Sequence, residues 1–535
     1  MSNIDPKLIE QLNFQQGQII NCNDKKVVVS AGPGSGKTYT IVKRIAKELS
    51  DIKFNQGIIA CSFTKEASKQ LEERLELKCD ISNSYIGTID SFVLMGIIDP
   101  YKNRLIKHWN GKNNVKKLKI RMAEMKSLAS EITKYGTKYY DKVAYKNYLN
   151  KWKNDFLNGV YEISFANYLV AIYLIRNLPE AKDYLSNKYK SIYIDEAQDL
   201  NEFQHMLIKV LADECQLNCF LIGDKNQSIY QFRGARPEQF YNLCNLGYTE
   251  YKINVSVRCH KSILEFANSI VDDKYVITGS DESRVKFNIL PTAEELSSIS
   301  GNFMILFETN ESALLWYKYL IKKDIEVIYS KPIELSDKDF KDEYFDLIEE
   351  ILLFYYNWEN KNLKLTYRID DFKTYLSNFI LEEEIKNAVL LDFGTNVVEY
   401  LEKILKIFNV NMKESIKQEL SKQLVDNVYI NHYKKFENVN RIMTIHSSKG
   451  LESDNVFVVF RKLPYNYNDE YKRKLFVAFS RAKNNLYISF SKDSGIKGSS
   501  FEALLINKVS KLVKKEGTVK ICITHQKKKT IVNME

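Results

Sequence analysis

A single short loop restricts what this chain can fold into more than any other part of the sequence. Residues 31–38, AGPGSGKT, follow the apolar run 27–30 and precede a helical pattern over residues 39–49. Glycines let backbone N–H groups surround an anion without Cβ clashes, and a helix N-terminus adds partial positive charge. A strand, a glycine-rich loop, Lys-Thr and a helix are typical of a phosphate-binding loop. The predicted nucleotide site consists of Ala31, Gly32, Pro33, Gly34, Ser35, Gly36, Lys37 and Thr38.

A phosphate-binding loop works with a second carboxylate, and residues 191–196, SIYIDE, supply one. Asp195 ends an apolar run that is typical of a buried strand, and Glu196 follows it. On its own, an Asp-Glu pair at this place is as often a helix N-cap. Beside the loop, it predicts that Thr38 and Asp195 hold Mg²⁺. Lys37 would then reach the β- and γ-phosphates of a nucleotide, and Glu196 would orient and deprotonate the attacking water.

Apolar runs elsewhere in the chain predict further buried strands, and longer helical patterns separate them. Strands that alternate with helices favour an α/β fold with parallel sheets that are covered on both faces. The predicted strands are residues 27–30, 58–62, 191–195, 220–223, 303–307, 325–329, 442–445, 456–460 and 486–490. Two stretches, residues 93–180 and 331–435, show helical patterns and no strand pattern. We therefore expect two helical inserts in two α/β units.

Composition excludes several classes of protein. With 44% hydrophobic and 27% charged residues, the 535 residues suit several packed domains rather than a disordered chain. No apolar run approaches the ~18 residues of a membrane helix, and no secretion signal opens the chain, so we expect a cytoplasmic protein without a membrane. The eight cysteines lack zinc-site spacing and are expected to be reduced thiols in the core.

The charge of the chain suits a polyanionic partner. Lys and Arg number 78 against 68 Asp and Glu, and basic residues cluster between positions 102 and 126. Such a cluster is either a solvated helix face or a nucleic-acid contact, and the sequence leaves both interpretations open.

Several strings, in order along residues 12–483, resemble the motifs of superfamily 1 helicases of the UvrD, Rep and PcrA type. They are Leu12-Asn13 with Gln16, SFTKEAS at 62–68, GTIDSF at 87–92, DEAQDL at 195–200, GDKNQSIYQFRGA at 223–235, Val257-Arg258-Cys259, TIHSSKGLE at 444–452 and LFVAFSRAK at 475–483. The resemblance implies two RecA-like P-loop NTPase domains with ATP between them. It also implies 3′–5′ movement on single-stranded or tailed DNA.

The resemblance also implies roles for individual residues. Gln16 would bind the adenine, Glu452 the ribose, and Gln227 would sense the γ-phosphate. Arg258 and Arg481 would act as arginine fingers, which stabilise charge on the transferring phosphoryl group. The residues implied to line a groove for single-stranded DNA are Phe63, Thr64, Thr88, Tyr230, Phe232, Arg233 and His446.

The sequence departs from the family pattern at five positions. Phe232 stands where the family usually has Trp, and Asp90 where it has His. Ser453 replaces a Phe, and Val257 replaces an aromatic residue before the arginine. Tyr39 stands where an Arg often follows the loop threonine. These departures predict weaker base stacking on DNA and an adenine pocket in which Tyr39 provides the stacking platform.

The motif positions give a domain division. Residues 1–92 with 181–255 and residues 256–330 with 436–497 would be the two RecA-like domains, 93–180 and 331–435 the inserts, and 498–535 a helix, a short strand and a basic tail. The second insert is short, and it carries an apolar stripe. The members of this stripe are Phe345, Leu347, Ile348, Ile351, Leu352 and Tyr355. The stripe either packs within the insert or binds a partner protein.

The short insert and the string RGARPEQF at 233–240 resemble the UvrD-like subunits of Gabija antiphage defence systems. This resemblance implies a partner nuclease in a hetero-oligomer. The leading hypothesis is a DNA-dependent ATPase and single-strand translocase within such a complex. A free-standing repair helicase and a DNA-sensing scaffold with little unwinding are the alternatives.

Overall fold

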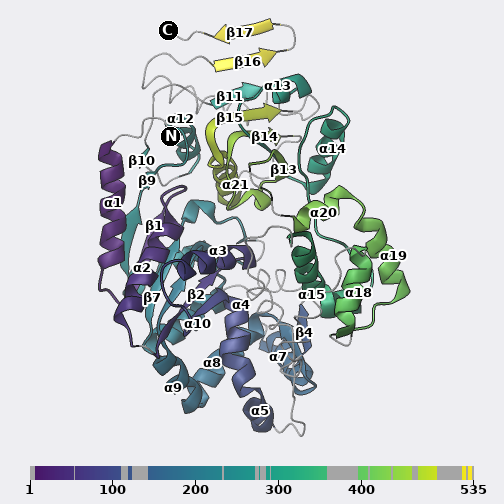
Figure 1. Cartoon of the computed structure of the whole chain (residues 1–535). Coiled ribbons are helices and arrows are strands. Elements are labelled where there is room, and N and C mark those ends of the chain that lie inside the picture. The colour runs from purple at the N-terminus through teal and green to yellow at the C-terminus, as the bar shows by residue number, and fades with distance from the viewer. Residues whose placement is uncertain are drawn as a thin grey trace.

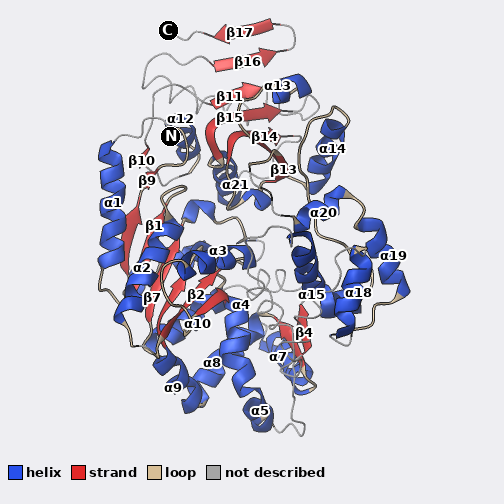
Figure 2. Cartoon of the chain, viewed as in Figure 1, coloured by secondary structure: helices blue, strands red, loops and turns tan. Residues whose placement is uncertain are grey.

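Two parallel β-sheets organise the chain, and helices cover the faces of both, as Figure 1 and Figure 2 show. The computed structural model describes residues 6–53, 55–109, 119–122, 142–231, 234–271, 276–277, 285–288, 291–357, 396–407, 410–434, 436, 438–460, 468–490, 521–525 and 528–532. Within these residues the α/β class with parallel sheets is confirmed. No helix of this described part is long and apolar enough to cross a membrane.

The first sheet has six parallel strands in the order β3-β2-β6-β7-β1-β8. Their bounds are β1 (Lys26–Ala31), β2 (Gly57–Ser62), β3 (Tyr85–Thr88), β6 (Tyr189–Ile194), β7 (Asn218–Gly223) and β8 (Thr249–Ile253). Side chains of successive residues point to opposite faces, so Val27 and Val29 of β1 join one hydrophobic cluster and Val28 joins another. Burial on both faces explains why the central strands are continuous apolar runs.

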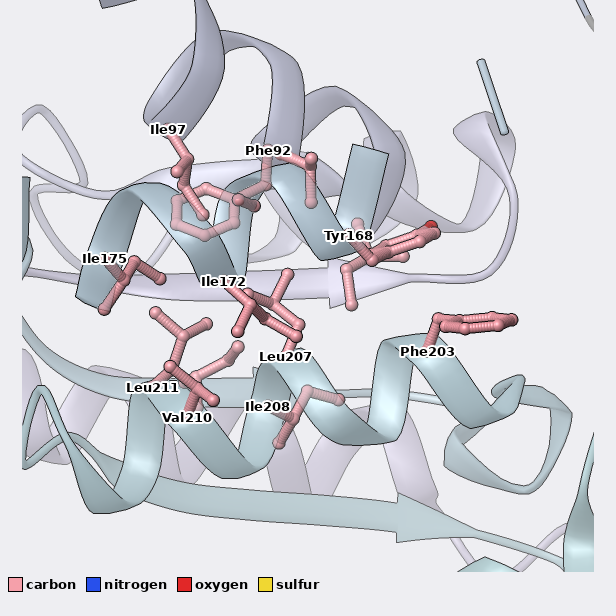
Figure 3. Packing of buried hydrophobic residues seen from close by; sticks show 14 of the residues in the cluster. Phe92, Ile97, Tyr168, Ile172, Ile175, Phe203, Leu207, Ile208, Val210 and Leu211 are labelled. Carbon is pink, nitrogen blue, oxygen red and sulfur yellow. The ribbon is translucent and has the colours of Figure 1, made fainter. Parts of the chain in front are cut away.

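Helices from distant parts of the chain cover the two faces of this sheet. α1 (Pro6–Asn21), α2 (Lys37–Asp51) and α3 (Lys65–Glu76) pack on one face. α8 (Phe165–Asn177) and α10 (Glu202–Asp213) pack on the other, and Figure 3 shows Ile172 of α8 lying near Leu207 of α10. Further short helices of this part are α4 (Ile89–Phe92), η1 (Val93–Ile98), η2 (Ala197–Asp199), η3 (Lys225–Gln227), α11 (Pro237–Tyr241) and η5 (Cys244–Leu246).

The second sheet has five parallel strands in the order β11-β15-β14-β12-β13. Their bounds are β11 (Val285–Asn288), β12 (Phe303–Phe307), β13 (Arg441–Thr444), β14 (Ser453–Phe460) and β15 (Ala482–Phe490). α12 (Lys261–Asn268) and α21 (Asp469–Phe479) pack on one face, and α14 (Asn310–Ile321) on the other. The remaining elements near this sheet are α13 (Ala293–Ser297), η6 (His446–Ser448), the pair β9 (Val255–Ser256) and β10 (Val276–Ile277), and the hairpin β16 (Ile521–His525) and β17 (Lys528–Val532).

Two expectations about strands are wrong. Residues 325–329 form only an isolated bridge between Ile328 and Arg441, although Ile325 and Tyr329 are buried as an inner strand would be. Pro332 follows three residues later and has no N–H to extend the ladder. The first insert does contain strands, because β4 (Lys119–Met122) and β5 (Val160–Ile163) pair in parallel. Each has only four residues and a mixed polar sequence, which gives no apolar run to recognise.

The two inserts are otherwise helical where they are described. The first contains α5 (Asp99–His108), α7 (Lys142–Leu157) and α9 (Pro179–Lys188) besides α8. The second contains α15 (Lys338–Asn357), α18 (Val397–Ile407), α19 (Glu414–Gln423) and α20 (Asn427–Tyr433). α15 lies against β4 of the first insert, as Figure 1 also shows.

The apolar stripe of α15 packs within its own insert. Leu347, Ile348, Ile351 and Leu352 are buried in one cluster with α18, α19 and α20, and Phe345 and Tyr355 pack against that cluster. The hypothesis that this stripe binds a partner is therefore wrong. The helix expected after residue 498 and the lysines at 116 and 117 lie outside the described residues.

Candidate nucleotide site and nucleic-acid interface

The loop between β1 and α2 needs glycine at two positions. Gly34 has φ 67° and Gly36 has φ 77°, which side chains other than glycine rarely adopt. A Cβ on Gly36 would lie 2.6 Å from Nε2 of Gln16, and a Cβ on Gly34 would lie 2.2 Å from Cβ of Arg258. The loop is therefore enclosed by α1 on one side and by the segment at Arg258 on the other.

Side chains around this loop turn toward its backbone. Lys37 Nζ donates to the carbonyls of Ala31 and Gly32, both at 3.3 Å. Gln16 Nε2 donates to the carbonyl of Ser35 at 2.9 Å, so α1 is tied to the loop. Thr38 is half-buried in the first turn of α2.

Tyr39 differs from these residues because its side chain is 51% exposed. The ammonium group of Lys43 lies 5.7 Å from its ring centroid. A ring in this position, one residue after the loop threonine, is available for stacking. Val257, also exposed, comes from the segment that contacts the loop, since its N–H donates to the carbonyl of Gly34 at 3.2 Å.

Asp195 and Glu196 follow β6 at the carboxyl end of the first sheet. The Asp195 N–H donates to the carbonyl of Cys61 at 2.9 Å, which extends the β2–β6 pairing to the strand tip. Glu196 has φ 54°, a left-handed conformation that is uncommon for residues other than glycine. Its N–H donates to Oδ1 of Asp195 at 2.8 Å, and its Oε2 accepts from Nε2 of Gln198 at 2.5 Å. Backbone strain of this kind gathers at functional sites.

The two carboxyl groups differ in proton affinity. Burial and the charge of Glu196 raise the pKa of Asp195 to about 6. Burial alone would raise the pKa of Glu196 as well, but the nearby Lys449 and Lys37 lower it to about 2. A buried carboxylate with a raised pKa at a strand tip fits a binding site for a cation.

Arg481 connects the second sheet to the first. Its side chain is buried between α21 and β15, and Nη2 donates to Oε1 of Gln227 at 3.1 Å. Nε2 of Gln227 in turn donates to Oδ2 of Asp224 at 2.5 Å. Burial and the charge of Arg258 lower the pKa of Arg481 to about 9. The Gln227 side chain thus links Asp224, at the end of β7, with an arginine of the other sheet.

Arg258 and Glu452 form an ion pair with 2.6 Å between Nε and Oε2. The Arg258 Nε–H is not aligned for a hydrogen bond there, so the contact is electrostatic. Lys483 Nζ lies 2.8 Å from the other carboxylate oxygen. Burial alone would raise the pKa of Glu452, but Lys483 and Arg258 lower it. Both implied residues therefore lie beside the loop, with Glu452 holding Arg258.

Lys449 has no role predicted from the sequence, although it lies within the string TIHSSKGLE. Its ammonium group contacts the carboxylate of Asp199, donates to the carbonyl of Gln227 at 3.0 Å and lies 3.7 Å from Oε2 of Glu196. Its side chain is 9% exposed and that of Asp199 is 0% exposed. Burial alone would lower the pKa of Lys449, but Asp199 and Glu196 raise it.

Three of the residues implied to bind DNA form one aromatic stack. The rings of Phe63 and Tyr230 lie 5.0 Å apart at 17°, and those of Tyr230 and His446 lie 6.4 Å apart. Thr64 and Thr88 cap the N-termini of α3 and α4, and their hydroxyls accept from backbone N–H groups. Because β2 and β3 are adjacent, these threonines lie at the same sheet edge. Phe232 and Arg233 are outside the described residues.

Asp90 faces the core of the first sheet rather than this edge. Its carboxylate accepts a hydrogen bond from the Tyr168 hydroxyl, and that hydroxyl accepts from Nε2 of Gln204 at 2.8 Å. Burial raises the pKa of Asp90. The residue that replaces the family histidine thus joins the packing of α4, α8 and α10.

Comparisons with known proteins place both sheets in the same family. Residues 15–233 match an AAA domain, and residues 441–489 match a UvrD-like helicase C-terminal domain. Gabija protein GajB of Bacillus cereus (strain VD045) is 26% identical over 86% of this chain and 92% of its own length. ATP-dependent DNA helicase Rep of Buchnera aphidicola is 22% identical over 90% and 93%. ATP-dependent DNA helicase PcrA of Bacillus subtilis is 28% identical over 51% and 41%. The chain belongs to the UvrD-like superfamily 1 helicases.

Proposed function

We propose that this protein hydrolyses ATP in a DNA-dependent manner and uses the energy to move 3′–5′ along single-stranded DNA. One observation carries the proposal: groups from both sheets converge on the phosphate-binding loop. Lys37 and Glu196 belong to the first sheet, whereas Arg258 and Arg481 come from the second. A site that is complete only when two sheets meet can couple hydrolysis to relative movement of the sheets.

The donor set fits Mg²⁺ together with a nucleoside triphosphate. Thr38 and Asp195 supply the hydroxyl and carboxylate oxygens that Mg²⁺ prefers. The bound ion would neutralise charge on the phosphate oxygens. Backbone N–H groups of residues 34–38 bind the phosphates, and Lys37 adds a positive charge. The remaining loop residues, Ala31, Gly32 and Pro33, shape the turn.

The other residues have separable roles. Glu196 orients the attacking water and takes its proton, and Gln227 contacts the terminal phosphate. Arg258 and Arg481 stabilise charge that develops there. Gln16 and Tyr39 hold the adenine, while Glu452 contacts the ribose and positions Arg258.

On the DNA side, half-buried aromatic rings suit stacking with unpaired bases. Phe63, Tyr230 and His446 give a sequence-tolerant platform, since every base has a flat face. Thr64 and Thr88 lie near it and contact phosphates, and we assign Phe232 and Arg233 to the same groove. The division into residues 1–92 with 181–255 and residues 256–330 with 436–497 follows from these roles.

Turnover with and without single-stranded DNA tests the catalytic assignment. We expect Lys37→Ala to abolish hydrolysis because the charge facing the phosphates is lost. Glu196→Gln should retain ATP binding and lose turnover because only the proton acceptor is removed. Lys47→Ala, at an exposed position of the same helix, is the matched control and should hydrolyse ATP normally. Normal turnover by Lys37→Ala or Glu196→Gln would refute the site.

We further propose that the chain acts in the cytoplasm as the helicase-like subunit of an antiphage defence complex with a nuclease. The similarity to Gabija protein GajB extends over 92% of that protein, which supports this assignment. Rep is covered to 93%, so a free-standing repair helicase is the second candidate.

Co-expression with the product of the neighbouring gene separates the two candidates. A stable hetero-oligomer in light scattering, and weak unwinding of a tailed duplex by the isolated chain, would support the defence complex. Processive unwinding by a monomer that does not bind the neighbour would support the repair helicase instead. DNA binding and complex formation without unwinding in any state would point to a sensing scaffold.

A further inference from the structure

Lys449 joins the nucleotide site to the aromatic stack. It follows η6 in the second sheet, and its ammonium group contacts three groups of the first sheet, namely Asp199, the Gln227 carbonyl and Glu196. The same ammonium lies 5.0 Å from the ring centroid of Tyr230. One side chain therefore touches both the carboxylate proposed to activate water and the ring proposed to stack on DNA.

The stack to which Tyr230 belongs is formed by separate segments. Phe63 follows β2, Tyr230 follows η3, and His446 opens η6, only three residues before Lys449. A base that stacks on these rings must take a ring face, and the faces of Phe63 and Tyr230 are now turned to each other at 17°. Entry of a base therefore changes the position of Tyr230, and with it the surface on which Lys449 rests.

We propose that Lys449 is a positioning residue that transmits occupancy of the Phe63–Tyr230–His446 stack to Glu196 and Gln227. The inference rests on the proposed function, because it concerns how DNA accelerates ATP hydrolysis. A ligand shifts an equilibrium only through interactions that differ between two states. Here the difference is in the partners of one ammonium group, which either spans Asp199, Gln227 and Glu196 or follows a displaced Tyr230.

A purely structural role for Lys449 makes a different prediction. The pair with Asp199 is buried, and removing one partner of a buried pair leaves an uncompensated charge. Any single substitution thus weakens the fold for a reason unrelated to coupling. Removing both charges, in the double variant Lys449→Met with Asp199→Asn, leaves no such charge. This variant separates the stability of the junction from the transmission of the signal.

The experiment measures the ratio of kcat with saturating single-stranded DNA to kcat without DNA, together with KM for ATP and thermal midpoints. Wild type, Lys449→Met, Asp199→Asn and the double variant are compared. Lys474→Met is the matched control: Lys474 also pairs with a carboxylate, Glu308 at 3.6 Å, and lies 5.7 Å from a tyrosine ring, that of Tyr471. That cluster lies within the second sheet and touches no residue of the nucleotide site.

We expect the double variant to regain the wild-type thermal midpoint while its DNA stimulation falls about fivefold or more, the usual range for coupling between sites. Lys474→Met should keep the wild-type ratio. A double variant that regains both stability and stimulation would show that Lys449 only joins the sheets, and the inference would fail. A wild type that DNA does not stimulate would instead overturn the proposed function.

A second comparison does not disturb the buried pair. Tyr230→Leu removes the ring under Lys449, and at saturating DNA it should also lower the stimulation. In the Lys449→Met background it should add little, because the two residues act in one connected series of side chains. Independent, additive losses would contradict transmission through Tyr230.

Discussion

At the scale of single residues, the two arginines from the second sheet are the sharpest test of the nucleotide site. Arg258→Ala and Arg481→Ala should each lower turnover by about 10³-fold, as the loss of an arginine finger does. ATP binding should persist because the loop and Lys37 are unchanged. Nucleotide affinity and steady-state turnover of both variants check this, and losses below about tenfold in both would contradict the roles.

The base pocket gives a second prediction for single residues. Val257 has no ring, so stacking on the base depends on the exposed Tyr39. We expect Tyr39→Ala to raise KM for ATP and to weaken the preference for ATP over GTP, whereas Tyr39→Phe should behave as wild type. A strong preference for ATP in Tyr39→Ala would assign base selection to Gln16 alone.

His205 of α10 should make stability depend on pH. Its Nε2 is buried without a hydrogen-bond partner among the described residues, and burial lowers its pKa to about 4. Above pH 6.5 the residue is neutral in both states and contributes nothing. Below that pH the unfolded chain binds a proton that the folded chain does not, so stability falls, by about 2 kcal/mol between pH 7 and pH 5.

Comparison with His205→Gln isolates this effect, since other groups titrate in the same range. The raised pKa of Asp199, about 6, acts in the opposite direction, because the folded protein takes up that proton first. The thermal midpoint of wild type should therefore fall more steeply than that of His205→Gln between pH 7 and pH 5. Parallel pH profiles would contradict the assignment.

The sequence predicted local groups of this site better than their connections. The loop at residues 31–38 and the pair Asp195-Glu196 are defined by neighbours in the chain, so their placement at strand ends followed from pattern alone. Lys449 was missed because its partners lie 222 and 250 residues away in the sequence. Asp90 was interpreted as a change in the DNA groove, whereas Tyr168, 78 residues away, draws it into the core.

At the scale of elements, burial and apolar content explain which strands were predicted. β12 (Phe303–Phe307) has every residue buried, and its bounds were predicted from its apolar run. β8 (Thr249–Ile253) was missed because it is an edge strand of the first sheet with one buried residue. Segment 325–329 shows the opposite case, because burial without a backbone ladder leaves the same sequence pattern.

The junction between the loop and the second sheet yields a prediction at this scale. A Cβ on Gly34 would overlap Arg258, so Gly34→Ala must displace the segment that carries this arginine. We expect a fall in turnover of about 10²-fold, as for misplacement of a catalytic group by ~1 Å. Gly247→Ala is the control: its φ is +84° and nothing lies within 4 Å, so it should cost about 1 kcal/mol of stability and no activity. Equal activity of the two variants would contradict the junction.

At the scale of the whole molecule, contacts between the two sheets gather around the nucleotide site. Arg481 reaches Gln227, Arg473 Nε donates to the carbonyl of Ser228 at 2.9 Å, and Lys449 reaches Asp199. Far from this site, α15 of the second insert lies against β4 of the first. The two inserts therefore meet at a second place, and movement of the sheets that hydrolysis drives must be accommodated there as well.

The net charge of +10 belongs to this scale and predicts how the protein meets DNA. Bound phosphates release counterions, so log affinity for single-stranded DNA should fall linearly with log salt, by about 0.7 for each phosphate that the protein neutralises. Sequence preference should be weak, because stacking on Phe63, Tyr230 and His446 does not read base edges. Affinities for mixed-sequence oligonucleotides at several salt concentrations give the slope.

Replacing Lys116, Lys117 and Lys119 with Ala then tests the basic cluster of the first insert. If the cluster binds phosphates, the slope should become shallower by about 0.7 for each phosphate that the variant no longer neutralises, while the affinity extrapolated to high salt changes little. The matched control replaces three exposed lysines of the second insert or second sheet, Lys318, Lys322 and Lys422, and removes the same net charge. A general effect of charge would alter both variants alike. A slope that changes only with the first set would show that the first insert lies along the DNA, and an unchanged slope would identify the cluster as a solvated surface.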